Sequence, residues 1–255
     1  MPYRGPMRHD QIALQLYTVR ELASQDLPGT LRAVAAAGYT SVELAGLPDV
    51  PAGKLSALLE AANLRVVASH EGIERLREDV TAVAERLAEI GCPRVIVPWM
   101  PEDDRHDVDA VRRFAVELGG FAQELARHGM RLGYHNHDFE FASLDGTTIW
   151  DVMLAELPPA IELELDVYWA VVGGRDPEAE IRANPGRIRL LHMKDLASGD
   201  ERHDAPVGEG VLPFPSIVDA ARTAGVEWYI VEQDKPAHAL DDIGRSLANL
   251  TALAT

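Results

Sequence analysis

LGYHNHDFEF, residues 132–141, is the first of four segments in which an apolar run is followed closely by a side chain able to bind a metal ion. The other three runs are IELELDVYW (161–169), IRLLHMKD (188–195) and WYIVEQD (228–234). Their candidate ligands are Glu140, Asp166, His192 and Glu232. Strands that close into a parallel barrel bring their C-terminal ends to one rim, where these side chains can share a cation. The four runs therefore predict an enzyme with its chemistry at that rim.

The same alternation of a short β-rich run and a helical segment extends over the whole chain. Eight strands are predicted, at residues 12–17, 41–45, 65–70, 94–99, 130–136, 160–166, 188–193 and 227–232. Several helical segments between them end in a residue that favours a left-handed cap: Gly38, Asn63, Gly91, Gly129 and Gly225. The 255 residues are close to the roughly 250 of a typical (β/α)8 barrel, and no linker interrupts them. We therefore expect one TIM barrel domain over residues 1–255.

Eight such units fit a closed barrel or an open doubly wound sheet, and hydrophobic periodicity does not separate the two. The polar and aromatic side chains at the predicted strand ends do separate them. In chain order these side chains are Gln15, Glu43, His70, Trp99, His135, Asp166, His192 and Glu232. An open sheet would spread them along a line, whereas a barrel gathers them around one basin. This arrangement favours the α/β class with a closed TIM barrel.

The composition excludes several classes of protein. The net charge is −17 at pH 7, so a polyphosphate backbone would be repelled and we expect no nucleic-acid partner. Cys92 is the only cysteine, which excludes an intramolecular disulfide and a cysteine-rich zinc site. The chain has no apolar run long enough to cross a membrane and no signal-like N-terminal segment. We expect a cytoplasmic enzyme without membrane contact, and the sequence leaves its oligomeric state open, a homo-oligomer included.

The densest polar stretch of the chain is YHNHDFE, residues 134–140. Alternation along a strand places His135 and His137 on one side, so two imidazoles accompany Glu140 there. We favour Glu140 as the ligand from the fifth strand, because a carboxylate can also act as a base, and His135 is the alternative. Oxygen donors with one imidazole suit a single divalent ion, Mn²⁺, Mg²⁺, Co²⁺ or Zn²⁺. Lys194 follows His192 closely and is expected at the rim.

Further residues near the strand ends are candidates for holding the substrate. Aromatic side chains there can stack on the apolar face of a sugar, although each can equally serve packing. The glycine-rich loop PVGEG, residues 206–210, can offer backbone amides to an anionic group or form a plain turn. The predicted substrate-binding residues are Gln15, Tyr17, His70, Trp99, Trp169 and Glu209.

The motifs QLYTVR, YHNHDFEF, LDVYW, HMKD, VGEG and VEQD resemble those of the xylose-isomerase-like TIM barrels, the sugar phosphate isomerase/epimerase superfamily. The resemblance covers nearly the whole chain and implies one divalent metal held by Glu140, Asp166, His192 and Glu232. Epimerases of that family usually carry Glu where this chain has His135. The YHNHDFEF form is also similar to members that act on oxidised sugars, including inosose dehydratases and lyases that cleave 3-keto-glycosides.

The first hypothesis is isomerisation or epimerisation of a sugar or keto-sugar. A proton is abstracted next to a carbonyl, and the metal stabilises the enediolate that develops. Glu232 is the expected base, with Glu140 or His137 as the acid on the opposite face. Lys194 or His70 is expected to help hold the oxyanion.

The alternative is a lyase or dehydratase that acts on an oxidised sugar. It uses the same first step, after which the enolate expels a β-oxygen substituent that His135 or His137 protonates. A third hypothesis, an endonuclease IV-like DNA repair enzyme, needs more metal ligands and a basic surface, and the acidic charge argues against it. A fourth is a sugar-binding or regulatory barrel without catalysis.

Overall fold

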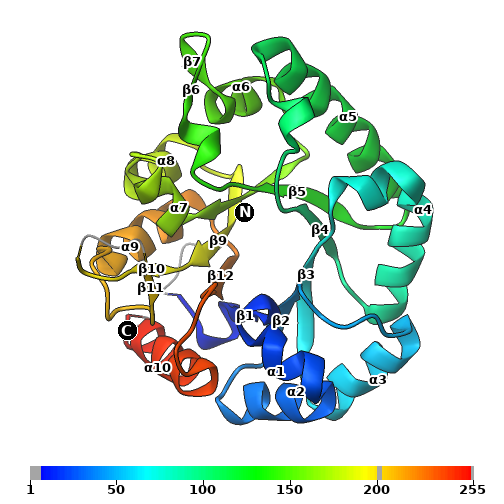
Figure 1. The fold of residues 1–255 in the computed structure, drawn as a ribbon, viewed down its shortest axis with the longest axis vertical. Coiled ribbons are helices and arrows are strands. Elements are labelled where there is room, and N and C mark those ends of the chain that lie inside the picture. The colour runs from blue at the N-terminus through cyan, green and yellow to red at the C-terminus, as the bar shows by residue number, and fades with distance from the viewer. Residues whose placement is uncertain (1–6, 200–202, 254–255) are drawn as a thin grey trace.

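The computed structural model describes residues 7–199 and 203–253. Eight parallel strands close into a barrel in the order β1-β12-β9-β8-β5-β4-β3-β2, and helices surround it (Figure 1). The barrel strands are β1 (Ile12–Gln15), β2 (Ser41–Leu44), β3 (Arg65–His70), β4 (Arg94–Val97), β5 (Arg131–His135), β8 (Glu162–Asp166), β9 (Ile188–Met193) and β12 (Trp228–Val231). Each lies within the residues predicted for it, and the closed barrel confirms the predicted fold.

The helices pack on the outside of the barrel and return the chain to the starting rim of the next strand (Figure 1). They are α1 (Arg20–Gln25), α2 (Leu27–Ala36), α3 (Ala52–Ala61), α4 (Ile73–Ile90), α5 (Val108–Arg127), α6 (Ile149–Glu156), α7 (Val167–Val172), α8 (Pro177–Ala183), α9 (Phe214–Ala224) and α10 (Ala239–Ala252). Of the helices in the described part of the chain, none is both long enough and apolar enough to span a membrane. Two short hairpins, β6 (Ser143–Leu144) with β7 (Thr147–Thr148) and β10 (Asp195–Leu196) with β11 (Asp204–Ala205), stand outside the barrel.

The predicted left-handed positions at the helix ends are confirmed. Positive φ angles occur at Gly38, Asn63, Gly91, Gly129 and Gly225. A residue without Cβ, or a short polar one, adopts this conformation at little cost, so the chain can leave the helix and enter the next strand within a few residues. The local sequence therefore sets the repeat of helix, cap and strand.

Asp79 interrupts helix α4. The helix begins at Ile73, and Asp79 lies inside it with the extended angles φ −162° and ψ 92°. The Asp79 carboxylate accepts a hydrogen bond of 2.9 Å from the backbone N–H of Ala82. Asp79 thus caps the second part of α4 as an N-cap residue does.

The barrel interior is layered along its axis. At the N-terminal ends of the strands, the buried Arg94 donates to Glu162 across 2.9 Å. Gly133 leaves room for the side chain of Ile96 in the next layer, because a Cβ at Gly133 would lie 2.6 Å from Cδ1 of Ile96. The middle is apolar and consists of Ala13, Val67, Ala68, Ile96, Leu190 and Ile230. The polar side chains at the C-terminal ends of the strands form the third layer.

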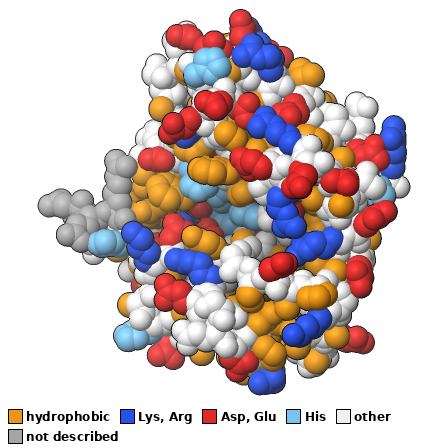
Figure 2. All heavy atoms as spheres, turned by 45° about the vertical axis from the view of Figure 1, so that its right-hand side comes forward, with side chains coloured by type: hydrophobic (Ala, Val, Ile, Leu, Met, Phe, Trp, Pro, Cys, Tyr) orange, Lys and Arg blue, Asp and Glu red, His pale blue; other side chains and the backbone are white. Residues whose placement is uncertain are grey.

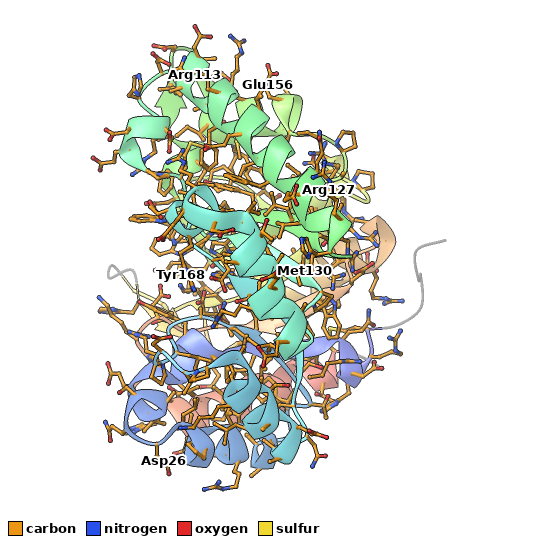
Figure 3. The ribbon with its side chains drawn as sticks, turned by 90° about the vertical axis from the view of Figure 1, so that its right-hand side faces the viewer. Asp26, Arg113, Arg127, Met130, Glu156 and Tyr168 are labelled. Carbon is orange, nitrogen blue, oxygen red and sulfur yellow. The ribbon has the colours of Figure 1, made fainter. Side chains whose placement is uncertain are left out.

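Figure 3 shows how the two rims are related. Helix α5 runs from Arg113 near one rim to Arg127 near the other, and Met130 lies at this second rim just before β5. Tyr168, just after β8, lies on the opposite side of the molecule from Met130. The C-terminal ends of the strands therefore face one common rim, the position at which barrels of this type carry their active sites.

Candidate metal centre and its pocket

Three of the four predicted metal ligands converge at this rim. Asp166, His192 and Glu232 each offer a ligand atom, and these atoms all lie within 4.8 Å of one another. All three side chains are buried. They come from three neighbouring strands, β8, β9 and β12, so the barrel order alone brings them together.

The two carboxylate oxygens of Asp166 differ in their contacts. Oδ1 accepts a hydrogen bond of 2.9 Å from the backbone N–H of Trp169, which makes Asp166 the N-cap of α7. Oδ2 is buried and has no hydrogen-bond partner among the described residues. A buried carboxylate oxygen without a partner is costly, and a cation at this point would remove the cost. The carboxylate can therefore serve as helix cap and metal ligand together.

Glu140, the fourth predicted ligand, is not brought into this group. Its Oε1 accepts from the hydroxyl of Tyr134 at 2.6 Å, and its Oε2 accepts from the backbone N–H of His137 at 2.8 Å. Burial raises the pKa of Glu140 to about 7. Its carboxylate thus fixes the backbone that carries His137.

His135 instead lies against the converging side chains. Its ring centroid is 4.5 Å from that of His192, and its Nδ1 lies 3.1 Å from Oε2 of Glu164. His135 also lines the central pocket together with Glu232. The imidazole therefore has one nitrogen next to a carboxylate, which leaves Nε2 to act as a donor atom.

His192 is held from both sides. Its Nδ1 lies 2.9 Å from Oε2 of Glu232, and its Nε2 lies 2.7 Å from Oε2 of Glu43. Gln15, which was predicted to touch substrate, is fully buried and donates to Glu43 across 2.7 Å. Gln15 thus orients a carboxylate beneath the pocket floor.

Glu164 and Glu43 contact the histidines of the site, a role that the sequence analysis did not assign to either residue. Oε2 of Glu164 is 2.8 Å from Nε2 of His70 and 3.1 Å from Nδ1 of His135. The signal for Glu164 was the alternation in Glu162-Leu-Glu164-Leu-Asp166, because every second residue of a barrel strand points inward. Glu43 was noted at a strand end without a role.

The charges of this buried network compensate one another. Burial alone would raise the pKa of Glu43, but His70 and His192 lower it to about 2. Burial and Glu43 would likewise raise the pKa of Glu164, and the neighbouring imidazoles of His192 and His135 lower it to about 2. For His70, burial lowers the pKa, and the two carboxylates raise it to about 10. Two carboxylates are thus held ionised next to a cationic imidazole.

A cavity of about 540 Å³ opens above the network. Figure 2 shows this hollow, with histidine side chains in its floor and hydrophobic and cationic groups at its edges. Of the predicted substrate-binding residues, Tyr17, His70 and Trp169 line it. His137 also lines it, with its ring stacked parallel to Phe139 and its Nδ1 buried and unpartnered among the described residues.

Trp99 and Glu209 do not line this cavity. Trp99 lies one residue beyond Pro98, which does line it, and the indole is 48% exposed. The alternation of β4, continued beyond its end at Val97, points Arg94, Ile96 and Pro98 inward and turns Trp99 away. Glu209 accepts a hydrogen bond of 2.7 Å from Arg245 on α10.

The PVGEG loop does bind an anionic group with its backbone amides, and that group is a side chain of the same protein. The backbone N–H groups of Gly208, Gly210 and Leu212 donate to the carboxylate of Asp195 at 2.9 to 3.1 Å. Asp195 is fully buried. The loop is therefore a structural anchor beside the rim.

Lys194 is also buried and lies beside the pocket. It forms an ion pair with Asp234, and its Nζ lies 3.8 Å from Oε2 of Glu232. The ammonium group also lies 5.0 Å from the ring centroid of Trp169, within cation–π range. Lys194 thus holds the charged end of Glu232 and one face of the pocket in place.

The donor set fits a divalent cation. It combines the carboxylates of Asp166 and Glu232 with the imidazole of His192, and Oδ2 of Asp166 has no hydrogen-bond partner among the described residues. His135 lies next to His192 and belongs to a second group of possible ligands, with His70, Glu164 and His192. Carboxylate oxygens suit Mn²⁺ and Mg²⁺, and imidazoles suit Zn²⁺ and Co²⁺. Carboxylates next to the second nitrogen of His135 and of His192 are typical of metal-bound histidines.

Comparison with known proteins identifies the family of this barrel. The profile of the family described as xylose isomerase-like TIM barrel matches residues 31–253. The chain belongs to this family. No curated protein gives a significant match.

Solved structures agree with membership of the xylose isomerase-like family. A sugar phosphate isomerase/epimerase from Parabacteroides distasonis is 25% identical, with a TM-score of 0.83 over 96% of this chain and 95% of that one. At 15% identity, the IOLI protein with a bound zinc atom has a TM-score of 0.73 over 96% and 98% of the chains. The probable 3-DHS dehydratase AsbF from Bacillus anthracis, also at 15%, has a TM-score of 0.70 over 94% and 98%. The last two likenesses concern the fold alone.

Proposed function

We propose that this protein is a divalent-metal-dependent isomerase or epimerase that moves a proton at a carbon next to a carbonyl of a sugar or keto-sugar. The observation that carries the proposal is the convergence of Asp166, His192 and Glu232 beneath a pocket, where the buried Oδ2 of Asp166 has no hydrogen-bond partner in the part of the chain that the structure describes. When bound there, a divalent cation supplies Lewis-acid polarisation of a carbonyl oxygen.

The proposed ligands are Asp166, His192 and Glu232, with His135 as the fourth. His135 is favoured over Glu140 because both oxygens of Glu140 already accept hydrogen bonds. His135 has its Nδ1 against Glu164 and lines the same pocket as Glu232. This set of two imidazoles and two carboxylates favours Mn²⁺, Co²⁺ or Zn²⁺ over Mg²⁺.

His137 and Glu232 are the proposed proton carriers. Both line the pocket, and they follow the C-terminal ends of β5 and β12, which are separated around the barrel by β8 and β9. They therefore approach a substrate from different sides. One group removes the proton from carbon and the other returns it, which is the arrangement that proton transfer between two faces or two carbons requires.

The pocket walls support a sugar-sized substrate. Tyr17 and Trp169 offer aromatic surface for the apolar face of a sugar ring, and Trp169 is fixed by its contacts with His137 and Lys194. His70 lies at the floor between two carboxylates and can donate a hydrogen bond to a substrate oxygen.

Hydrogen exchange and metal content together test the proposal. The metal-loaded protein is incubated in D₂O with a panel of ketoses, and deuterium incorporation next to the carbonyl is followed by NMR. Glu232→Gln should abolish exchange with a modest loss of metal, whereas Asp166→Ala and His192→Ala should lose metal on elemental analysis. Full metal occupancy in both alanine variants would remove these residues from the coordination sphere and refute the proposed centre.

A lyase is the second candidate, and the pair His135 and His137 favours it. The two ring centroids lie 5.1 Å apart, at and just after the end of β5. His137 lines the pocket, and its buried Nδ1 has no hydrogen-bond partner among the residues described. Such an imidazole can protonate an oxygen leaving group after the carbon–hydrogen bond is broken. Incubation with a 3-keto-glycoside distinguishes the two, since release of the aglycone supports the lyase and exchange without release supports the isomerase.

A further inference from the structure

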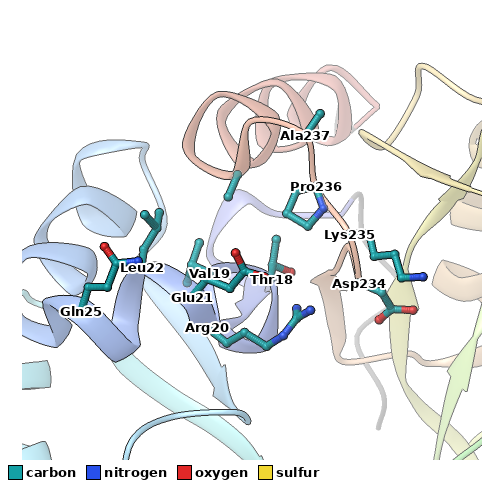
Figure 4. Close-up of a pocket in the computed structure, with 11 residues that line it drawn as sticks. Thr18, Val19, Arg20, Glu21, Leu22, Gln25, Asp234, Lys235, Pro236 and Ala237 are labelled. Carbon is teal, nitrogen blue, oxygen red and sulfur yellow. The ribbon is translucent and has the colours of Figure 1, made fainter.

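Two cationic side chains lie at the edge of the central pocket. Arg20 and Lys235 line the central cavity and also a neighbouring one of about 370 Å³ (Figure 4). Figure 4 shows Arg20 extending toward the segment that carries Asp234 and Lys235. Among the described residues, neither cation forms a salt bridge, although the chain carries a net charge of −17. The acidic groups of the chain outnumber the basic ones, and yet these two cations have no acidic partner within residues 7–199 and 203–253.

Arg20 is held in position by Tyr17. Its guanidinium carbon lies 4.0 Å from the Tyr17 ring centroid, and Nη1 donates to the Tyr17 carbonyl at 2.9 Å. Gly46 makes this possible, because it has φ +65° and a Cβ there would lie 2.7 Å from the Tyr17 ring. The remaining guanidinium N–H groups are therefore available in a fixed plane, the geometry that suits a phosphate or a carboxylate.

The backbone of Lys235 is anchored to the hairpin beside the pocket. Its N–H donates to Oδ2 of Asp204 at 3.1 Å, which ties the segment after β12 to β11. The neighbouring carboxylate of Asp234 is paired with the buried Lys194. The ammonium of Lys235 is consequently not neutralised by the acid next to it.

We propose that Arg20 and Lys235 bind an anionic group of the substrate, a phosphate or a carboxylate, at the edge of the pocket. This inference deepens the proposed function and rests on it for the identity of the ligand as a substrate. A neutral sugar would leave both cations without a counter-charge, whereas an anionic substituent pairs with them while the sugar reaches toward His137 and Glu232. The site thus selects sugars that carry a negative charge.

Calorimetric titration tests the proposal without turnover. Inorganic phosphate, glucose 6-phosphate, glucuronate and neutral glucose are titrated into the wild-type protein and into an Arg20→Met/Lys235→Met double variant. We expect at least one anion to bind more tightly than glucose and to lose affinity by about tenfold or more in the double variant. Preference for phosphate or for glucuronate identifies the anionic group.

Two further variants make the result specific. Arg32→Met/Lys54→Met removes two exposed cations away from the pocket and should leave anion binding unchanged. Gly46→Ala should displace the Tyr17 ring and weaken anion binding while both cations remain. Equal anion binding by the wild-type protein and the Arg20/Lys235 variant, as for phosphate held only by a metal, overturns the proposal. So does a wild-type protein that binds no anion more tightly than glucose. Deuterium exchange with both neutral and phosphorylated ketoses reports on the proposed function separately, because exchange with either class supports proton transfer whatever the anion titration gives.

Discussion

Nε2 of His192 lies 2.7 Å from Oε2 of Glu43, so a residue of β9 is oriented by a carboxylate from β2. The strands β12 and β1 separate these two around the barrel. His192 can present Nδ1 to a metal only while Nε2 is directed at such a partner. The geometry of the proposed metal centre thus depends on residues from beyond its own strands.

Substitution Glu43→Gln should weaken metal binding about 10- to 100-fold without removing any proposed ligand. The amide can no longer attract the Nε2 proton of His192 as the carboxylate does. Competition with a chromophoric chelator measures the affinity. Lys54→Met, at an exposed helical position, is the control, and unchanged metal affinity in Glu43→Gln would show that His192 does not need this partner.

His135→Ala and Glu140→Gln should have different effects on bound metal. We expect His135→Ala to lose metal, because the proposed fourth ligand is gone. Glu140→Gln should keep metal but slow turnover, since the Glu140 carboxylate fixes the backbone of His137. Elemental analysis and deuterium exchange separate the two effects. The reverse outcome, metal lost only in Glu140→Gln, would restore Glu140 as the ligand.

The Cys92 thiol should resist chemical modification at neutral pH. Its ionisation should lower the free energy of unfolding at alkaline pH. Burial raises the pKa of Cys92 from 9.0 to about 12. Because the pKa in the folded state is raised, its contribution to stability is complete below about pH 9 and is lost as the pH rises toward 12. In that window the loss is about 1.4 kcal/mol per pH unit.

Urea unfolding between pH 8 and 10.5 checks this against Cys92→Ser, which cannot ionise there. The difference in unfolding free energy between the two proteins should shrink as the pH rises. A difference independent of pH, or rapid reaction of the native protein with Ellman's reagent, would contradict the raised pKa.

Arg94→Met should destabilise the barrel without affecting metal content. Arg94 is buried at the N-terminal ends of the strands and bonds Glu162 and Glu227. Without the Arg94 guanidinium, the negative charges of Glu162 and Glu227 are only partly compensated, which should lower the free energy of unfolding by about 3 kcal/mol. Urea unfolding measures the loss. Arg182→Met, which removes an exposed pair on α8, should change stability little. Equal effects of the two substitutions would mean that the buried ion pair is not a stabilising feature.

The sequence by itself determined the barrel and most of the floor of its site. Positive φ angles occur at the glycine and asparagine residues that were predicted to end the helices, and all eight strands lie within their predicted ranges. These are local properties, set by backbone sterics and by hydrophobic period. Asp166, His192 and Glu232 converge because neighbouring parallel strands must end at the same rim.

The tertiary structure decided what each polar side chain faces. Glu140 turns to Tyr134 and His137, the amides of the PVGEG loop bind Asp195, and Glu164 joins imidazoles from two other strands. The pairing of Arg20 with Tyr17 likewise depends on Gly46 from the next unit. A buried polar atom takes the nearest partner that the closed barrel offers, and that partner often lies far away in sequence. Local patterns therefore give the position of a side chain along a strand, while closure of the barrel fixes its contacts.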